Sequence, residues 1–243
     1  MDGKFYTDIH CHILYGVDDG AQSLEESEAM IAAAREEGIR TIYLTPHYIY
    51  GKNHYDAKTL RERFDTLQQR CSETYDDMSL YLGNEILYTP SVLEALDRGE
   101  ALTLGDSQYV LVEFRTTEEY SVIYEGLKNL VEGGYSPIIA HVERYEALYR
   151  RVNRVEDLIC LGAYLQVNCR SILGGPMNKT AAWVRRLIKN RSIHFVADDS
   201  HNMDGRCPLM EAAAQKLLQK FDADDAERIL YFNPKRLLEN KYI

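Results

Sequence analysis

The sequence lacks the features that mark membrane, secreted and nucleotide-binding proteins. No stretch of the chain approaches the ~20 consecutive apolar residues that a membrane-spanning helix needs. It contains no GxGxxG and no GxxxxGK[ST] loop, so nucleotide binding loses its usual support. No basic segment followed by an apolar run opens the chain, and we therefore expect no secretory signal.

The cysteine pattern gives no indication of disulfide crosslinks. The cysteines are scattered, odd in number and never paired as Cys-x-x-Cys, at Cys11, Cys71, Cys160, Cys169 and Cys207. This pattern argues against a disulfide framework and against a zinc site made of thiolates. We therefore expect the protein to work in the reducing cytoplasm.

Basic residues are fewer than acidic residues. The chain has 28 Lys and Arg against 38 Asp and Glu, for a formal net charge of −10. Surfaces that bind nucleic acid concentrate Lys and Arg, so we expect no nucleic-acid partner. Carboxylates that bind divalent cations are neutralised by them, and part of this acidity can therefore belong to a metal site.

What the sequence does contain is an alternation of strand-like and helix-like segments. Apolar runs rich in β-branched and aromatic residues predict strands at 5–13, 39–47, 80–86, 109–114, 137–142, 163–169 and 193–199. Between them, helical patterns occupy 23–38, 57–75, 90–97, 121–132, 154–161, 178–190 and 208–220. In a chain of 243 residues this alternation favours a closed or nearly closed α/β barrel, and we expect one domain over residues 1–243.

Histidines and carboxylates recur where these predicted strands end. On the first strand His10 and His12 share one face, and Cys11 points away from them. Asp18 and Asp19 lie in the loop after this first strand. Further groups end or follow the later strands: His47, Glu85, Glu113, His141, Asp199 and His201. In βα barrels the carboxyl ends of the strands form the rim that holds the active site.

Each of these residues taken alone has an ordinary structural explanation. A lone strand histidine is more often a hydrogen-bonded core residue than a ligand, and Asp18 suits a turn. Several carboxylates at the same end of apolar strands are costly unless they are paired or metal-bound, so their convergence favours ions. Nitrogen and oxygen donors without thiolate fit Zn²⁺, Mn²⁺ or Fe²⁺, and this many groups imply two or three ions.

Two further histidines and two arginines need a separate interpretation. His54 and His194 fall outside the pattern, and we assign them no ligand role. Arg144 and Arg206 trail His141 and His201 by a few residues. Because a planar guanidinium binds phosphate through two parallel hydrogen bonds, we expect both arginines to contact a substrate phosphate.

The segments DIHCHI, VDDG, TPH, NEI, EF, HVERY and DSHN, in this order, resemble the polymerase-and-histidinol-phosphatase (PHP) superfamily. More narrowly, the chain resembles the bacterial capsular and exopolysaccharide protein-tyrosine phosphatases over almost all of its length. The likeness includes QVN in the sixth predicted strand and the NP at Asn233. HVER stands where HPER is frequent and DDSHN where SDAHN is frequent, and neither change removes a ligand.

The resemblance implies a distorted TIM-like (β/α)7 barrel with a trinuclear site, usually active with Mn²⁺. It implies one ion held by His10, His12, Glu85 and Asp199, a second by Glu85, Glu113 and His141, and a third by Asp19, His47 and His201. The implied reaction is hydrolysis of phosphotyrosine, with Arg144 and Arg206 clamping the phosphate. The implied substrate is a bacterial tyrosine autokinase that controls polysaccharide export.

Two other functions remain open and one mechanism is excluded. A cysteine-based phosphatase needs a C-x5-R loop, but the sixth residues after the cysteines are Val17, Asp77, Gln166, Gly175 and Ala213. A small-molecule phosphatase, such as histidinol phosphatase, is an alternative on the same site. A metal-bound regulatory module on a degenerate barrel is another, and the complete ligand set counts against it.

Overall fold

The computed structural model describes residues 5–53, 55–175 and 177–243. The loop histidine His54 therefore lies outside the described residues. Within them, none of the helices combines the length and the apolar character that a bilayer-spanning segment requires.

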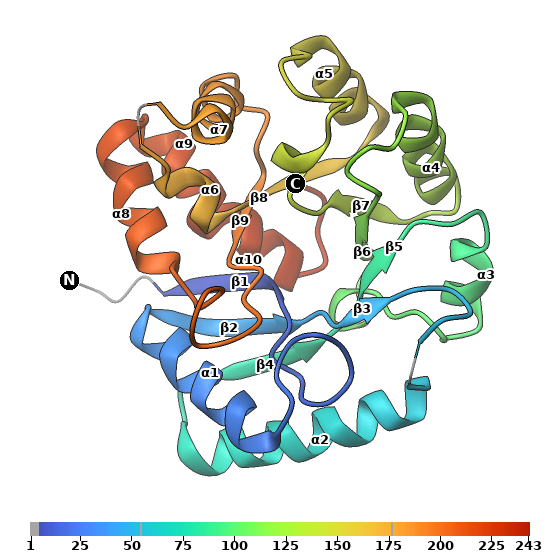
Figure 1. The fold of residues 1–243 in the computed structure, drawn as a ribbon, viewed down its shortest axis with the longest axis vertical. Helices are drawn as coiled ribbons and strands as arrows, with labels where there is room; N and C mark the ends of the chain where they lie inside the picture. Colours follow the sequence, from blue (N-terminus) through green and yellow to red (C-terminus); the bar gives the residue numbers. More distant parts are fainter. Residues whose placement is uncertain (1–4, 54, 176) are drawn as a thin grey trace.

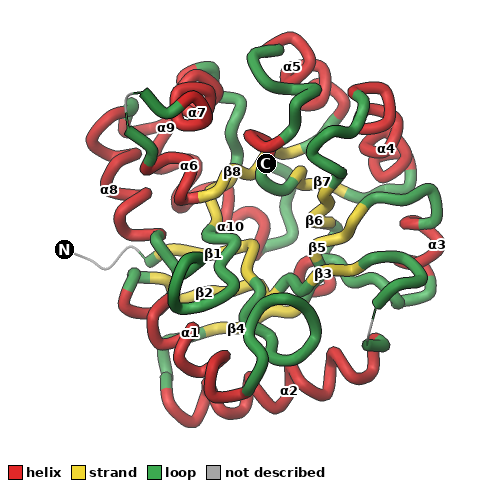
Figure 2. The backbone as a smooth tube through the Cα atoms, viewed as in Figure 1, coloured by secondary structure: helices red, strands yellow, loops and turns green. Residues whose placement is uncertain are grey.

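Parallel strands wrap around a common axis, and helices cover their outer side (Figures 1 and 2). One sheet has the order β1-β2-β4 and the other the order β3-β5-β6-β7-β8-β9. The strands are β1 (Tyr6–Cys11), β2 (Ile39–Leu44), β3 (His47–Tyr48), β4 (Ser79–Leu82), β5 (Glu85–Leu87), β6 (Tyr109–Glu113), β7 (Ser136–Ile139), β8 (Tyr164–Asn168) and β9 (Phe195–Ala197). Each predicted strand is present.

Two of the predicted strands are interrupted, which is a correction to the expected boundaries. Thr45 and Pro46 separate β2 from β3, because a proline cannot donate a ladder hydrogen bond. Gly83 and Asn84 separate β4 from β5 at the same level, and the Glu85 amide bridges the break by donating to the Thr45 carbonyl at 3.2 Å. Since β3 continues β2 and β5 continues β4, the nine described strands fill seven positions.

The barrel closes between its first and last strands. The Asp199 amide donates to the His10 carbonyl and the His12 amide donates to the Ser200 carbonyl, both at 2.8 Å. A parallel bridge also joins Cys11 to Ser200. The predicted seven-stranded α/β barrel is thus confirmed, and its seam brings the two ends of the sequence together.

The helices lie close to their predicted positions. They are α1 (Leu24–Glu36), α2 (Ala57–Thr74), α3 (Val92–Asp97), α4 (Tyr120–Glu132), α5 (Val152–Leu161), α7 (Lys179–Lys189) and α8 (Met210–Lys220). Side chains at their starts explain several boundaries: Ser23, Asp56 and Asn178 each accept a backbone N–H of the first turn. The sequence reasoning missed the short helices α6 (Cys169–Leu173), α9 (Ala223–Glu227) and α10 (Asn233–Leu238), which are too short to show a periodic pattern.

Two apolar cores leave one end of the barrel polar. A large cluster of aliphatic side chains lies between the strands and the surrounding helices. A smaller one, with Ile9, Tyr43, Leu111, Ile138 and Phe195 among its members, fills the barrel interior. The buried charged and polar residues Glu85, His141 and Asp199 lie at the strand ends instead. The apolar side chains inside the barrel therefore lie beneath a ring of polar side chains at one end of it.

The loop after β1 packs directly against the backbone of His12. The Ala21 amide donates to the His12 carbonyl at 3.0 Å, and a Cβ atom on Gly20 would overlap that same carbonyl oxygen. Gly20 therefore permits the close approach that holds the loop against β1.

We predict that Gly20→Ala destabilises the protein by about 1–3 kcal/mol, because the added methyl group displaces the loop or the strand. Chemical denaturation measures the change. Gly205→Ala is the matched control: a Cβ there meets open space, and it should change stability by no more than about 0.5 kcal/mol. Equal stability of the two variants would contradict this packing.

Candidate metal centre

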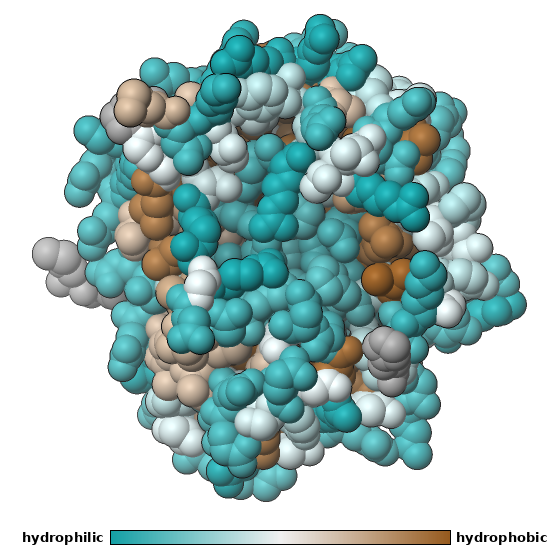
Figure 3. All heavy atoms as spheres, viewed as in Figure 1, coloured by the Kyte–Doolittle hydropathy of each residue, from teal (hydrophilic) through white to brown (hydrophobic). Residues whose placement is uncertain are grey.

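The predicted histidines and carboxylates meet at the rim of the barrel. Most lie near or just beyond the carboxyl ends of β1, β6, β7 and β9, whereas His47 and Glu85 are the first residues of β3 and β5, which continue β2 and β4. Figure 1 looks onto this end, and hydrophilic residues fill the centre of the same face (Figure 3). Five imidazoles and four carboxylates lie within ion-pair distance of one another in a connected cluster, namely His10, His12, His47, His141, His201, Asp19, Glu85, Glu113 and Asp199.

The first strand presents its two imidazoles as its alternation predicts. His10 and His12 are fully buried, and their Nε2 atoms lie 3.3 Å apart. Other side chains orient the rings from behind: His12 Nδ1 lies 2.7 Å from Asp18 Oδ2, and His10 Nδ1 lies 3.2 Å from Gln166 Oε1. Cys11 points away, with its Sγ 3.4 Å from the Tyr43 carbonyl oxygen.

Glu85 lies at the centre of the cluster. Its carboxylate is 1 % exposed, and four imidazoles surround it. Oε1 lies 2.8 Å from His141 Nε2 and 3.2 Å from His10 Nε2. Oε2 lies 3.0 Å from His47 Nδ1 and 3.3 Å from His12 Nε2. A carboxylate reached from both sides in this way has the geometry of a bridging ligand.

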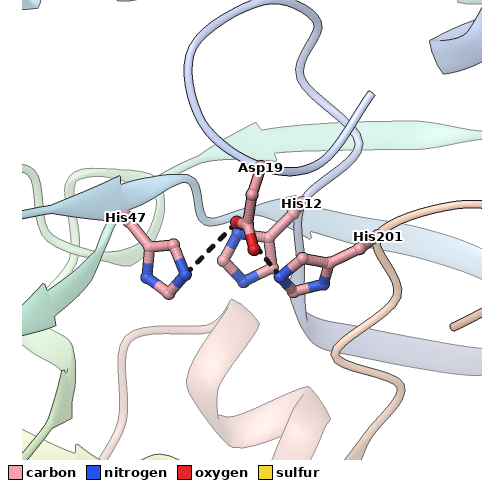
Figure 4. A group of neighbouring side chains, drawn as sticks. All are labelled: His12, Asp19, His47 and His201. Carbon is pink, nitrogen blue, oxygen red and sulfur yellow. Dashed lines mark ion pairs between the residues drawn. The ribbon is translucent and has the colours of Figure 1, made fainter. Parts of the chain in front are cut away.

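A second part of the cluster opens to solvent. Asp19, whose side chain is 65 % exposed, extends from the loop after β1 between His47 and His201, as Figure 4 shows. Its Oδ1 lies 3.5 Å from His47 Nε2 and 3.4 Å from His201 Nε2. The ring of His12 lies behind them, 3.8 Å from the ring of His201. These four residues form one compact set of donors.

Both predicted substrate arginines contact Asp199. Arg144 Nη2 lies 2.7 Å from Oδ2, and Arg206 Nη2 lies 2.7 Å from Oδ1. Asn168 Nδ2 also donates to Oδ2, at 2.8 Å. The two guanidinium groups therefore stand at the edge of the cluster, and each remains more than a third exposed.

Burial and charge together shift the pKa values of the cluster. Burial alone disfavours the imidazolium, but contacts with carboxylates outweigh it and raise the pKa of His12 and of His141 to about 9. Burial likewise opposes protonation of His47, yet Glu113 and Glu85 raise its pKa to about 11. Burial opposes ionisation of Glu85, but His10 and other imidazoles hold its pKa well below the usual range. The cluster thus needs positive charge to balance its carboxylates.

The donor set fits divalent cations. Three groups of donors have ligand atoms within 4.8 Å of one another: His12, Asp19, His47 and His201; His10, His12 and Glu85; and His47, Glu85 and Glu113. Among the described residues, His47 Nδ1 and His201 Nε2 are buried and lie near the carboxylates of Glu85 and Asp19 without forming a hydrogen bond of good geometry. Two imidazole nitrogens that face each other, as in His10 and His12, are also better satisfied by a cation than by one shared proton.

Comparison with known proteins adds an independent line of evidence. The family model for capsular polysaccharide synthesis, CpsB/CapC, matches residues 6–239. The chain belongs to the CpsB/CapC family. The predicted resemblance to bacterial capsular and exopolysaccharide phosphatases is thus confirmed.

Relatives in the CpsB/CapC family match the chain over nearly its full length. It is 36% identical over 241 residues to the tyrosine-protein phosphatase CpsB of Streptococcus pneumoniae, covering 97% of this chain and 99% of the relative. It is 33% identical over 236 residues to the tyrosine-protein phosphatase YwqE of Bacillus subtilis (strain 168), covering 97% and 92%. A crystal structure also aligns with the chain, with a TM-score of 0.89 and 32% sequence identity, covering 98% of this chain and 96% of the other. It comes from a study of YwqE and S. pneumoniae CpsB, which describes these proteins as unique metal-dependent tyrosine phosphatases.

Several residues that support this CpsB/CapC site were not predicted as functional. Gln166 accepts the backbone N–H of His141 at 2.7 Å, and His141 has a left-handed backbone with φ 35°. Asn168 holds Asp199, whose φ is 52°. Both side chains come from the QVN segment of β8, where polar residues alternate within a buried strand. This alternation is the sequence signal that could have identified Gln166 and Asn168 as functional residues. His194 lies outside the cluster, as expected, with its ring against Tyr164.

We predict that binding of a divalent cation at pH 7 releases protons, because the raised pKa values of His12, His47 and His141 keep these imidazoles charged in the metal-free CpsB/CapC centre. Apparent affinity should rise as the pH increases toward about 9, where His12 and His141 lose their protons. Calorimetry in buffers of different ionisation enthalpy measures the release. Binding at pH 7 without proton release would mean that the imidazoles are already neutral.

Proposed function

We propose that this chain is a metal-dependent protein-tyrosine phosphatase, with one catalytic domain over residues 1–243. The observation that carries the proposal is the buried Glu85 carboxylate ringed by four imidazoles, in a chain of the CpsB/CapC family. Two full-length relatives described as tyrosine-protein phosphatases support the choice of substrate.

We assign three sets of ligands in the proposed centre. They are His10, His12, Glu85 and Asp199; Glu85, Glu113 and His141; and Asp19, His47 and His201. We propose Mn²⁺ as the physiological ion, with Fe²⁺ or Zn²⁺ as other ions that this mixed nitrogen and oxygen set suits. Bound divalent cations would acidify water and neutralise phosphoryl oxygens.

Arg144 and Arg206 orient the phosphate. Each guanidinium has five N–H donors, and the hydrogen bond to Asp199 uses one of them. The remaining donors suit the oxygens of a phosphoryl group beside the cluster. Asp199 thus fixes both arginines at the edge where a substrate arrives.

The leaving group and the cysteines agree with this chemistry. Tyrosine has a pKa of about 10, so its phenolate departs more readily than an alkoxide and a dedicated general acid is less necessary. A thiolate nucleophile is disfavoured because burial raises the pKa of Cys11 and of Cys169 well above the usual range. The more exposed Cys160 and Cys207, like the others, lack the arginine of a C-x5-R loop. We therefore assign no catalytic role to cysteine.

The proposed substrate is a phosphotyrosine-bearing protein, and specifically a bacterial tyrosine autokinase that controls capsular polysaccharide synthesis. The description of the family supports the pathway. We place the reaction in the cytoplasm, which suits the unpaired cysteines. An open rim lets the metal centre accept a side chain presented on a peptide.

We predict that Mn²⁺-loaded protein hydrolyses a phosphotyrosine peptide with a kcat/KM at least about tenfold above that for histidinol phosphate, because the phenolate is the better leaving group. Glu85→Gln should abolish the activity, since it removes the central charge of the cluster. Glu132→Gln, an exposed surface change, is the control. Faster turnover of histidinol phosphate would favour a small-molecule phosphatase.

We also predict that Arg144→Ala and Arg206→Ala each lower kcat/KM by about 10–100-fold, the effect of losing a charge-assisted hydrogen bond to phosphate. The bound metal should remain, which elemental analysis of the variants measures. Arg98→Ala, at the C-terminal end of the outer helix α3, is the control. Wild-type kinetics in both arginine variants would remove these residues from the substrate site.

A further inference from the structure

A pocket lies in the helical layer, outside the barrel. Helices α7 and α8 flank the short helix α6, as the left side of Figure 1 shows. A cavity of about 500 Å³ lies between α7 and α8. Its walls include Arg185 and Lys189 from α7, and Lys216, Lys220 and Phe221 from the end of α8. None of these residues belongs to the proposed metal centre, so the pocket is independent of the proposed phosphatase function.

The four cations of this pocket have no acidic partners. Among the described residues, none of them forms an ion pair, although acidic residues outnumber basic ones in the chain by 38 to 28. Just beyond α7, by contrast, Arg191 pairs with Asp225 at 2.8 Å. Among the described residues, no carboxylate therefore lies within ion-pair distance of these four cations.

Two of the head groups are nevertheless held in place. Lys216 Nζ donates to the carbonyls of Leu173 and Gly174, at 2.9 and 3.2 Å. Arg185 Nη1 donates to the same Gly174 carbonyl at 3.3 Å. These carbonyls end α6 and carry only partial negative charge, so they orient the two cations without neutralising them.

The remaining surface of the pocket is apolar. The ring of Phe221 and the methylene stems of the lysines form its walls. A cavity of this size, with few polar groups and a charged rim, resembles sites that bury a small organic ligand. Four cations suit a phosphate or diphosphate better than a single carboxylate.

We propose that this pocket binds a phosphorylated ligand that also carries an apolar or aromatic portion. The cations contact the phosphate, and Phe221 packs against the apolar portion. A soluble nucleoside diphosphate and the headgroup of an acidic phospholipid share this chemistry.

Equilibrium dialysis with ADP and sedimentation with vesicles containing an acidic phospholipid test the two sources separately. Lys189→Glu/Lys220→Glu is the main variant, because both lysines are exposed and neither contacts the protein backbone through a hydrogen bond in the described structure. Lys58→Glu/Lys235→Glu makes the same change of net charge on other helices and is the matched control.

We predict that one of the two probes binds, that Lys189→Glu/Lys220→Glu weakens the binding at least about tenfold, and that the control double variant retains it. Binding should also weaken as salt is raised. Hydrolysis of phosphotyrosine peptide should be unchanged in both double variants, so a failed phosphatase assay would leave this test intact. The proposal would be overturned if neither probe bound. It would also be overturned if wild type and Lys189→Glu/Lys220→Glu bound the probe with equal affinity, as expected if ADP binds only at the metal centre.

Discussion

The structure depends on the burial of one carboxylate, that of Glu85, among four imidazoles. A buried carboxylate without compensating charge is very unfavourable, so the surrounding side chains must supply protons or bind cations. The shifted pKa values express this constraint, since the imidazoles are driven toward the charged form and Glu85 is held ionised. Divalent cations satisfy the same requirement with more charge in less space. The candidate metal centre is therefore a consequence of where the fold places its carboxylates.

The barrel makes this placement possible by closing between β1 and β9. Two backbone hydrogen bonds at the seam set His10 and His12 beside Asp199 and His201, residues almost 190 positions apart in the chain. Polar side chains behind the cluster then fix individual groups: Asp18 orients His12, and Gln166 supports the strained backbone at His141. The apolar filling of the barrel interior keeps this rim rigid. Catalytic geometry and stability thus rest on the same strands.

Much of the site was readable from the sequence because it follows from strand periodicity. The alternation of His10, Cys11 and His12, and the placement of Glu113 at the end of a strand, need no knowledge of distant contacts. The breaks at Pro46 and Gly83 were hidden inside apolar runs that look continuous. The pairing of Arg144 and Arg206 with the same carboxylate was also hidden, because it depends on how two loops pack after the barrel closes. Short helices such as α6 could not be predicted because they are too short to show a repeating pattern. The basic pocket at the end of α6 could not be predicted for the same reason.

Anomalous diffraction from crystals grown with Mn²⁺ tests the proposed metal centre most directly. We predict strong anomalous peaks inside the cluster, with one on each side of the Glu85 carboxylate and another among Asp19, His47 and His201. Well-ordered protein with no anomalous density between these side chains, or with Mn²⁺ bound only at surface carboxylates, would contradict this prediction.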